Sequence, residues 1–230
     1  MTKPALSLSE VAFSWPGRSG FSLTCPAFDL AAGESVLLLG ESGSGKSTLL
    51  SLICGIVTAD RGQVAVNGTD LTTLRPGARD RFRADQIGVI FQQFNLLPYA
   101  SVADNILLPL RFAKARRDRA GGRDEADRLC TALGLPGDVM GQPAGRLSVG
   151  QQQRVAVARA LIGAPPLIVA DEPTSALDAA TQDSFLSLLF EQCARAGSAL
   201  LMVSHDERLG ARFDRVVDLA DIVTTDRGTA

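Results

Sequence analysis

Residues 35–47 read Ser35-Val36-Leu37-Leu38-Leu39-Gly40-Glu41-Ser42-Gly43-Ser44-Gly45-Lys46-Ser47. The apolar residues at the start are continuous rather than alternating, which is typical of a central parallel strand that is buried on both faces. The residues after the loop, 48–53, have helical spacing, and Gly55 is a candidate for the end of that helix. A buried strand, a glycine-rich turn and a helix in this order predict an α/β fold.

The spacing of Gly40, Gly45, Lys46 and Ser47 matches a phosphate-binding loop. Glycines let the backbone turn tightly and direct several N–H groups at one anion, and the following helix adds the positive end of its dipole. We expect Lys46 to reach the β- and γ-phosphates of a nucleotide and the Ser47 hydroxyl to ligate Mg²⁺. The residues predicted to line this site are Gly40, Glu41, Ser42, Gly43, Ser44, Gly45, Lys46, Ser47 and Thr48.

Two further apolar stretches end in residues that can do chemistry. Residues 167–170 form an apolar run before Asp171 and Glu172, and residues 199–203 form another before His205. Ligands of open α/β sheets bind beyond the carboxyl ends of the strands, so these positions suit a site. We expect Asp171 to hold Mg²⁺, and Glu172 to act as the general base that polarises the attacking water.

A second possible anion site lies in the segment 147–151, Leu-Ser-Val-Gly-Gln. Ser148 is a plausible helix cap, and Gly150 allows a close backbone approach. Because a phosphate already has its own loop, a natural explanation is that this helix start faces a phosphate bound by another subunit.

Composition excludes several classes of protein. The net charge is −2, with 23 basic and 25 acidic residues, so a basic surface for nucleic acid is not supported. The four cysteines, Cys25, Cys54, Cys130 and Cys193, form no C-x-x-C pair and are interpreted as small apolar residues in a reducing cytosol. We find no signal peptide and no run of about 18 apolar residues, so we do not expect the chain to cross a membrane by itself.

Residues from about 95 to 160 are rich in Ala, Arg, Asp and Leu with helical spacing, which predicts a mostly helical lobe. The charged stretch 114–128 mixes basic and acidic residues, and we interpret it as the solvated face of a helix.

Together these motifs resemble the ATP-binding subunit of an ABC transporter, with Walker A at residues 40–47, Walker B ending at Asp171 and a signature at residues 147–151. The resemblance implies an α/β fold with a P-loop NTPase (RecA-like) core, an antiparallel β subdomain and an inserted helical subdomain at about 95–160, within one domain over residues 1–230. It also implies ATP and Mg²⁺ as cofactors, and two subunits that meet head to tail. The partner is then a second copy of the chain or a homologous cassette, with Ser148, Gly150 and Gln151 acting across the dimer.

The same resemblance assigns the smaller motifs. Gln92 is similar to the glutamine that contacts Mg²⁺ and water and links the site to a transmembrane partner; Gln93 is adjacent. Asp178, in the segment 175–178, is similar to a residue that crosses the dimer interface, and His205 to the histidine that senses the γ-phosphate. Trp15 resembles the aromatic residue that stacks on adenine, with Phe13 as the alternative. Val149 departs from the family's pattern, which has glycine there, and would be strained if its backbone were left-handed.

The segment 91–98 with its continuation 101–106 is similar to the MacB/LolD/FtsE-like branch. This implies a separate permease, and export or extraction of lipoprotein, lipid or drug; mechanotransmission and import are the alternatives. A soluble translation or repair ATPase is disfavoured, because the chain has one cassette and no sustained heptads. We expect a cytoplasmic protein held at the inner face of the membrane by its permease. An apolar set could dock that permease or be buried in the lobe: Leu96, Leu97, Tyr99, Ile106 and Leu107.

Overall fold

The computed structural model describes residues 3–16, 20–41, 43–175, 177 and 179–227. The chain divides into two compact units. The first comprises Met1–Arg83 together with Ala199–Ala230, and the second comprises Ala84–Ser198. The chain passes from the first unit to the second within α2 (Pro76–Gln86).

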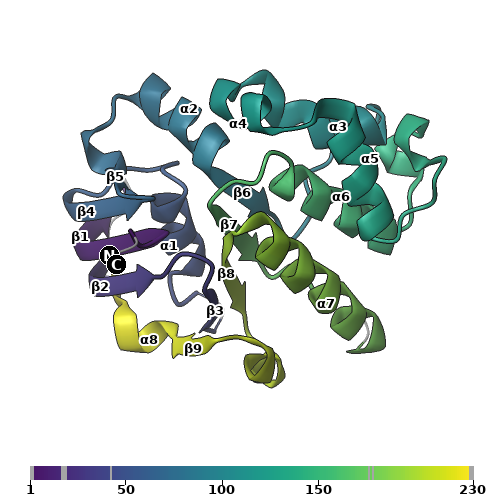
Figure 1. Ribbon diagram of the computed structural model, residues 1–230. Coiled ribbons are helices and arrows are strands. Elements are labelled where there is room, and N and C mark those ends of the chain that lie inside the picture. Colours follow the sequence, from purple (N-terminus) through teal and green to yellow (C-terminus); the bar gives the residue numbers. More distant parts are fainter. Residues whose placement is uncertain (1–2, 17–19, 42, 176, 178, 228–230) are drawn as a thin grey trace. The chain divides into compact units, whose positions relative to one another are not determined.

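The first unit contains an antiparallel sheet (Figure 1). Its strands, in spatial order, are β10 (Thr224–Arg227), β2 (Phe21–Leu30), β1 (Leu6–Ser14), β4 (Arg61–Val66) and β5 (Thr69–Asp70). The pairing of β1 with β4 shifts register between Ser9 and Ala12 around Glu10, whose φ is +49°. Opposite this bulge a side chain at Gly62 would meet the Glu10 carbonyl oxygen at 2.2 Å. The bulge therefore requires glycine at position 62.

Three parallel strands complete the sheet structure of this unit. The strand β3 (Ser35–Leu39) lies between β8 (Ala199–Ser204) and β9 (Arg215–Asp218) and is parallel to both. The central residues of β3 and all of β8 are buried, as expected of parallel strands. The helix α1 (Lys46–Ile53) follows β3 after the glycine-rich loop, and its four apolar residues Leu49, Leu50, Leu52 and Ile53 are buried. The strand–loop–helix prediction for residues 35–53 is thus confirmed.

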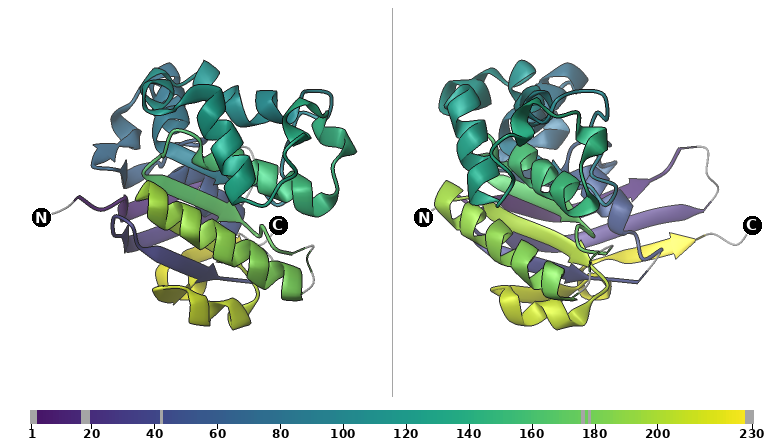
Figure 2. Two further views of the ribbon diagram at one scale, coloured as in Figure 1. Left: turned by 45° about the vertical axis from the view of Figure 1, so that its right-hand side comes forward. Right: turned by 90° about the vertical axis from the view of Figure 1, so that its right-hand side faces the viewer.

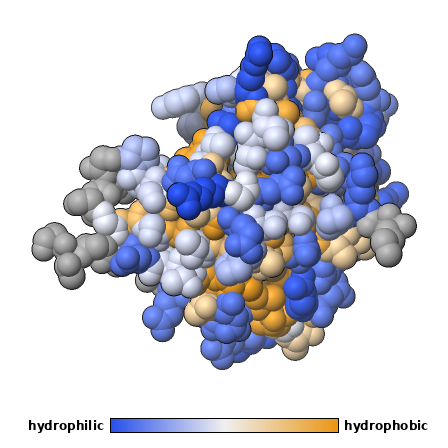
Figure 3. Space-filling view, turned by 90° about the vertical axis from the view of Figure 1, so that its left-hand side faces the viewer, coloured by the Kyte–Doolittle hydropathy of each residue, from blue (hydrophilic) through white to orange (hydrophobic). Residues whose placement is uncertain are grey.

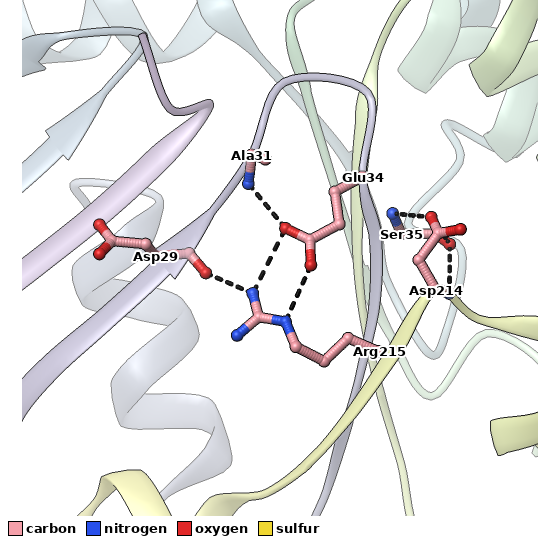
Figure 4. A network of polar contacts seen from close by, with 6 residues as sticks. All are labelled: Asp29, Ala31, Glu34, Ser35, Asp214 and Arg215. Carbon is pink, nitrogen blue, oxygen red and sulfur yellow. Dashed lines mark hydrogen bonds and ion pairs between the residues drawn. The ribbon is translucent and has the colours of Figure 1, made fainter. Parts of the chain in front are cut away.

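A polar network holds the start of β3 to the start of β9 (Figure 4). The Arg215 guanidinium donates to the Glu34 carboxylate, with Nε and Oε1 2.8 Å apart, and to the Asp29 carbonyl oxygen. The Asp214 carboxylate accepts from both the backbone N–H and the hydroxyl of Ser35, at 2.8 and 2.7 Å. These contacts join residues about 180 positions apart in sequence, so they fix the C-terminal segment to the strand that precedes the loop.

The remaining elements of the first unit are short: η1 (Leu71–Thr73), η5 (Glu207–Arg212) and α8 (Leu219–Ile222). The buried cysteines Cys25, Cys54, Cys130 and Cys193 are distributed over both units. Burial raises the pKa of Cys25 and Cys130 to about 11 and that of Cys193 to about 12, so these thiols stay protonated at neutral pH. Their interpretation as small apolar residues is confirmed.

The second unit combines a parallel strand pair with helices (Figures 1 and 2). The strands are β6 (Ile87–Ile90) and β7 (Leu167–Asp171), paired from Ile87 with Leu167 to Ile90 with Ala170. The helical elements are α3 (Val102–Leu107), η2 (Leu108–Arg111), α4 (Lys114–Arg119), α5 (Gly122–Ala132), η3 (Val139–Gly141), η4 (Ala144–Arg146), α6 (Val149–Leu161) and α7 (Ala179–Ala196).

The interpretation of residues 114–128 as a solvated helical face is wrong for Arg116. This side chain is 2% exposed and lies among backbone carbonyl groups. Its guanidinium donates five hydrogen bonds, to the carbonyl oxygens of Ala84, Ile87, Arg159, Ala160 and Ile162. Three of these acceptors lie at the C-terminal end of α6, where helix carbonyls lack intrahelical donors and where the helix dipole favours a cation. Arg116 therefore caps a helix of the core instead of contacting water.

On the face shown in Figure 3, hydrophobic areas lie among hydrophilic ones. The exposed large hydrophobic side chains of the described residues are Ile56, Leu97, Tyr99, Phe112, Val149 and Val216. Within the described residues, the helices are all too short or too polar to cross a membrane.

Candidate functional site

The glycine-rich loop turns into α1 at Gly45, which has a φ of +100°. A side chain there would also come within 3.0 Å of the Thr225 side chain, so both the backbone and the packing favour glycine. The start of α1 has no side-chain cap, so a bound anion can take the place of a cap at its first amide groups. Ser42 lies outside the described residues.

Lys46 folds back over the loop. Its ammonium donates to the carbonyl oxygens of Gly40 at 2.7 Å and Glu41 at 2.9 Å, and the Ser44 hydroxyl also donates to Glu41 at 2.8 Å. The Lys46 ammonium is therefore held against the backbone of the loop, while Ser47 is exposed at the start of α1.

Trp15 contacts the helix that follows the loop. Its indole Nε1–H donates to the Thr48 hydroxyl at 3.1 Å, and its ring meets Phe13 edge to face, with centroids 5.1 Å apart. Trp15 is partly exposed, whereas Phe13 is 5% exposed and belongs to the core. Of the two aromatic candidates, only Trp15 offers ring surface to a ligand.

His205 follows directly on β8 and is exposed, next to the buried Ser204. The amide of Gly40 donates to the Ser204 carbonyl oxygen at 3.3 Å. The beginning of the loop and the residue before His205 are thus adjacent, so the first unit brings together Trp15, the loop and the strand end that carries His205.

The other predicted residues belong to the second unit. Asp171 ends β7, and Glu172 follows it with a φ of +42°. A left-handed backbone is uncommon for a residue other than glycine and is frequent at functional sites. Gln92 and Gln93 are exposed in a turn that is closed by the Phe94 N–H donating to the Phe91 carbonyl oxygen at 3.0 Å.

The signature segment begins α6. Ser148 is the N-cap, and it forms a capping box with Gln151: the Gln151 amide donates to the Ser148 hydroxyl, and the Ser148 amide donates to the Gln151 side chain. The expected capping role of Ser148 is confirmed. A side chain added at Gly150 would meet nothing within 4 Å, so packing against the described residues does not explain glycine there.

Val149 is the first residue of α6 and is 53% exposed. It is not among the described residues with positive φ, so the strain considered for a left-handed valine does not arise. Asp178 lies outside the described residues.

The apolar set after Gln92 is divided between surface and core. Tyr99 is 96% exposed and Leu97 48% exposed, whereas Ile106 is fully buried. Burial in the lobe is therefore confirmed for Ile106, whereas docking of a permease by the exposed Leu97 and Tyr99 stays a prediction.

Comparison with known proteins identifies the family to which the chain belongs. The family model described as ABC transporter matches residues 23–175, which is well over half of the chain. The chain belongs to the ABC transporter family. It is an ATP-binding subunit with a P-loop NTPase fold, and it hydrolyses ATP.

Relatives and solved structures agree with this assignment. The ABC protein is 42% identical to an uncharacterised ABC transporter ATP-binding protein of Mycobacterium tuberculosis, over 94% of this chain and 87% of that protein. It is 44% identical to the lipoprotein-releasing system ATP-binding protein LolD of Anaeromyxobacter dehalogenans, over 84% and 80%. A dimeric bacterial ABC transporter cassette superposes with a TM-score of 0.76 at 32% identity, over 93% of each chain.

The ABC protein also matches one part of a longer relative. It is 39% identical to the macrolide export ATP-binding/permease protein MacB of Rhodopirellula baltica, over 84% of this chain and 28% of that protein.

Sequence reasoning missed several buried polar residues of the second unit, Asn105 and Arg159 among them. Asn105 accepts from the Leu97 amide and donates to the Leu97 and Ser101 carbonyl oxygens. Arg159 donates to the Phe94 and Asn95 carbonyl oxygens. A signal was present for Arg159, because it is a lone charge in the apolar run 155–161.

Proposed function

We propose that this chain is the motor subunit of an export or extraction system, which drives a separate transmembrane permease. The observation that carries the proposal is the 44% identity to LolD over 80% of that protein, together with the match to the ATP-binding part of MacB. Those names describe lipoprotein release and macrolide export, so the proposed cargo is a lipoprotein, lipid or drug. Mechanotransmission and import remain the competing functions.

Within the cassette we propose separate tasks for the two groups of residues. The loop with Lys46 binds the phosphates, and Trp15 stacks on the adenine. Glu172 takes the proton of the attacking water as general base, and His205 positions the γ-phosphate. The exposure of His205 and the ring surface of Trp15 support these roles. Preorganised positive groups around the transferring phosphoryl group supply most of the rate.

The residues proposed to hold Mg²⁺ are Ser47, Gln92 and Asp171. Their side chains offer hydroxyl, amide and carboxylate oxygens, which are the donors that Mg²⁺ prefers, so the donor set fits this ion. When bound, Mg²⁺ would neutralise charge on the β- and γ-phosphates.

We propose that the working unit is a head-to-tail pair of cassettes, with Ser148, Gly150, Gln151 and Asp178 contributing to the ATP of the partner. Two observations support this. The space around Gly150 is open, and Val149 beside it is an apolar residue that is 53% exposed. A glycine at a helix start with open space in front suits the close approach of a phosphate.

We further propose that the chain is one domain over residues 1–230, with the helical subdomain at about 95–160 inserted in the α/β core, and that it lies on the cytoplasmic face of the membrane. The exposed Leu97 and Tyr99 are the proposed permease contacts.

The permease decides among the competing functions. The tagged chain should be purified with its permease from native membranes, and the ATPase activity of the complex measured in lipid vesicles. A four-helix permease with a large external domain that stimulates turnover supports export or extraction. A permease with a substrate-binding protein would establish import, and recovery with ribosomes or DNA alone would contradict the proposal.

Lys46 provides the test of the nucleotide site. Lys46→Ala removes the ammonium that the loop backbone holds, so tight ATP binding should be lost. Equilibrium dialysis against labelled ATP measures this, with Lys114→Ala as the matched control, since Lys114 is exposed on α4. An unchanged affinity for ATP in Lys46→Ala would contradict the proposal that this loop binds the phosphates.

A further inference from the structure

Arg159 is a buried cation whose hydrogen bonds to described residues all go to backbone oxygens. It is 8% exposed, and its Nη1 and Nη2 donate to the carbonyl oxygens of Asn95 at 2.6 Å and Phe94 at 2.5 Å. Burial lowers the pKa of Arg159. Burying a guanidinium is costly unless its donors are hydrogen-bonded with good geometry.

The acceptors of Arg159 have an unusual backbone. Phe94 and Asn95 have φ values of +57° and +48°, so two consecutive residues other than glycine are left-handed. This conformation is disfavoured by contacts of Cβ with the backbone, and a bulky residue such as phenylalanine rarely adopts it. The hydrogen bonds from Arg159 hold both carbonyl groups in place.

These two residues form the base of the turn that presents Gln92. The Phe94 amide donates to the Phe91 carbonyl oxygen at 3.0 Å, and the Asn95 amide donates to the Gln93 carbonyl oxygen at 2.6 Å. The Phe94 side chain is buried, whereas Gln92 is exposed. Because the turn is short, holding its base in place also fixes the direction in which its exposed residues project from the core.

The helix that carries Arg159 is itself held at both ends. Its N-terminus has the capping box of Ser148 and Gln151, and its C-terminal carbonyl groups, including that of Arg159, accept from Arg116. Arg159 in the last turn and the signature residues in the first turn belong to one continuous helix, so the helix geometry sets the distance between them.

We propose that Arg159 is a positioning residue for Gln92, which it keeps in register with the signature segment by tying the base of the Gln92 turn to α6. This inference rests on the proposed role of Gln92 in the ATPase site. Arg159 itself contacts no nucleotide; it acts by holding the backbone from which Gln92 projects.

The test compares Arg159→Met with Arg154→Met in the full chain. Arg154 lies on the same helix, and its guanidinium also donates to a carbonyl oxygen, that of Gly134, away from the turn. In Arg159→Met, hydrogen exchange of the amides in residues 92–97 should accelerate at least tenfold, while the exchange of α6 is unchanged. The kcat for ATP should fall at least tenfold with KM within twofold of wild type. Arg154→Met should change neither the hydrogen exchange of residues 92–97 nor the kcat for ATP.

Two further variants separate positioning from a general loss of stability. Arg159→Lys keeps the charge and one donor nitrogen, so it should restore part of the exchange protection and of kcat. The double variant Arg159→Met/Gln92→Ala should be no slower than Gln92→Ala, because both changes remove the same group from the site. Losses that multiply, or wild-type exchange of residues 92–97 in Arg159→Met, would overturn the proposal. If Gln92→Ala alone keeps wild-type kcat, the proposed role of Gln92 fails, and the exchange data still decide whether Arg159 holds the turn.

Discussion

Replacing Arg116 with methionine should destabilise the second unit, because methionine keeps the length of the side chain and removes every donor. The five carbonyl groups that Arg116 satisfies would lose that donor. A buried carbonyl group without a donor costs about 1 kcal/mol, so the gross loss is about 5 kcal/mol. Removing the buried cation recovers part of its desolvation penalty, and the expected net loss is about 3 kcal/mol.

Thermal unfolding followed by circular dichroism measures this loss. For a chain of this size about 3 kcal/mol corresponds to a decrease in Tm of about 6–12 °C. Arg116→Lys should be at least as damaging, since it retains a buried charge with fewer bonds. The matched control is Arg119→Met, in which an exposed arginine loses two bonds to carbonyl oxygens, and its Tm should fall by about 2 °C or less. A Tm of Arg116→Met within 1 °C of wild type would refute the capping role.

Three further predictions concern other parts of the molecule. Gly88→Ala should unfold or severely destabilise the protein in a urea titration, because the new Cβ would lie 2.2 Å from the Ala160 carbonyl oxygen; a stable Gly88→Ala would contradict this packing. The hydrogen bonds from Ser35, that of its backbone N–H more than that of its hydroxyl, hold the pKa of Asp214 below its usual 3.8. The stabilising effect of the Asp214 carboxylate is therefore complete above about pH 5, and it is lost as the pH falls through the lowered pKa. The Tm difference between wild type and Asp214→Asn should therefore shrink below pH 4, and a constant difference would contradict it. Trp15 is the only tryptophan, so the fluorescence of the wild-type protein should change when ATP binds. An unchanged emission spectrum at saturating ATP would contradict the stacking of Trp15 on adenine.

The fold around the loop could be predicted from sequence because its signals are local. The apolar run before Gly40 and the helical spacing after Gly45 depend only on neighbouring residues, and the structure has β3 and α1 at these positions. Ser148 was predictable for the same reason, since its capping partner Gln151 is three residues away.

What the sequence did not reveal depends on distant contacts. The charges of residues 114–128 indicated a solvated face, yet Arg116 is buried because helix-end carbonyl groups more than 40 residues away in sequence need a donor. Helix α7 was not predicted, and neither was the bond from Trp15 to Thr48, 33 residues further along the chain. Spacing alone could not separate the buried Ile106 from the exposed Tyr99.

The central claim is that ATP is hydrolysed in a site shared by two copies of this chain, and Glu172→Gln tests it most directly. This variant keeps the shape of the side chain and removes the proposed base, so it should bind ATP and hydrolyse it far more slowly than wild type. On a sizing column with light scattering, in ATP and Mg²⁺, it should elute at twice the 24.2 kDa of one chain with one ATP retained per chain. Adding Ser148→Arg should return it to a single-chain mass, because the new side chain fills the proposed phosphate approach. Wild-type turnover in Glu172→Gln, or a single-chain mass with ATP bound, would contradict the account.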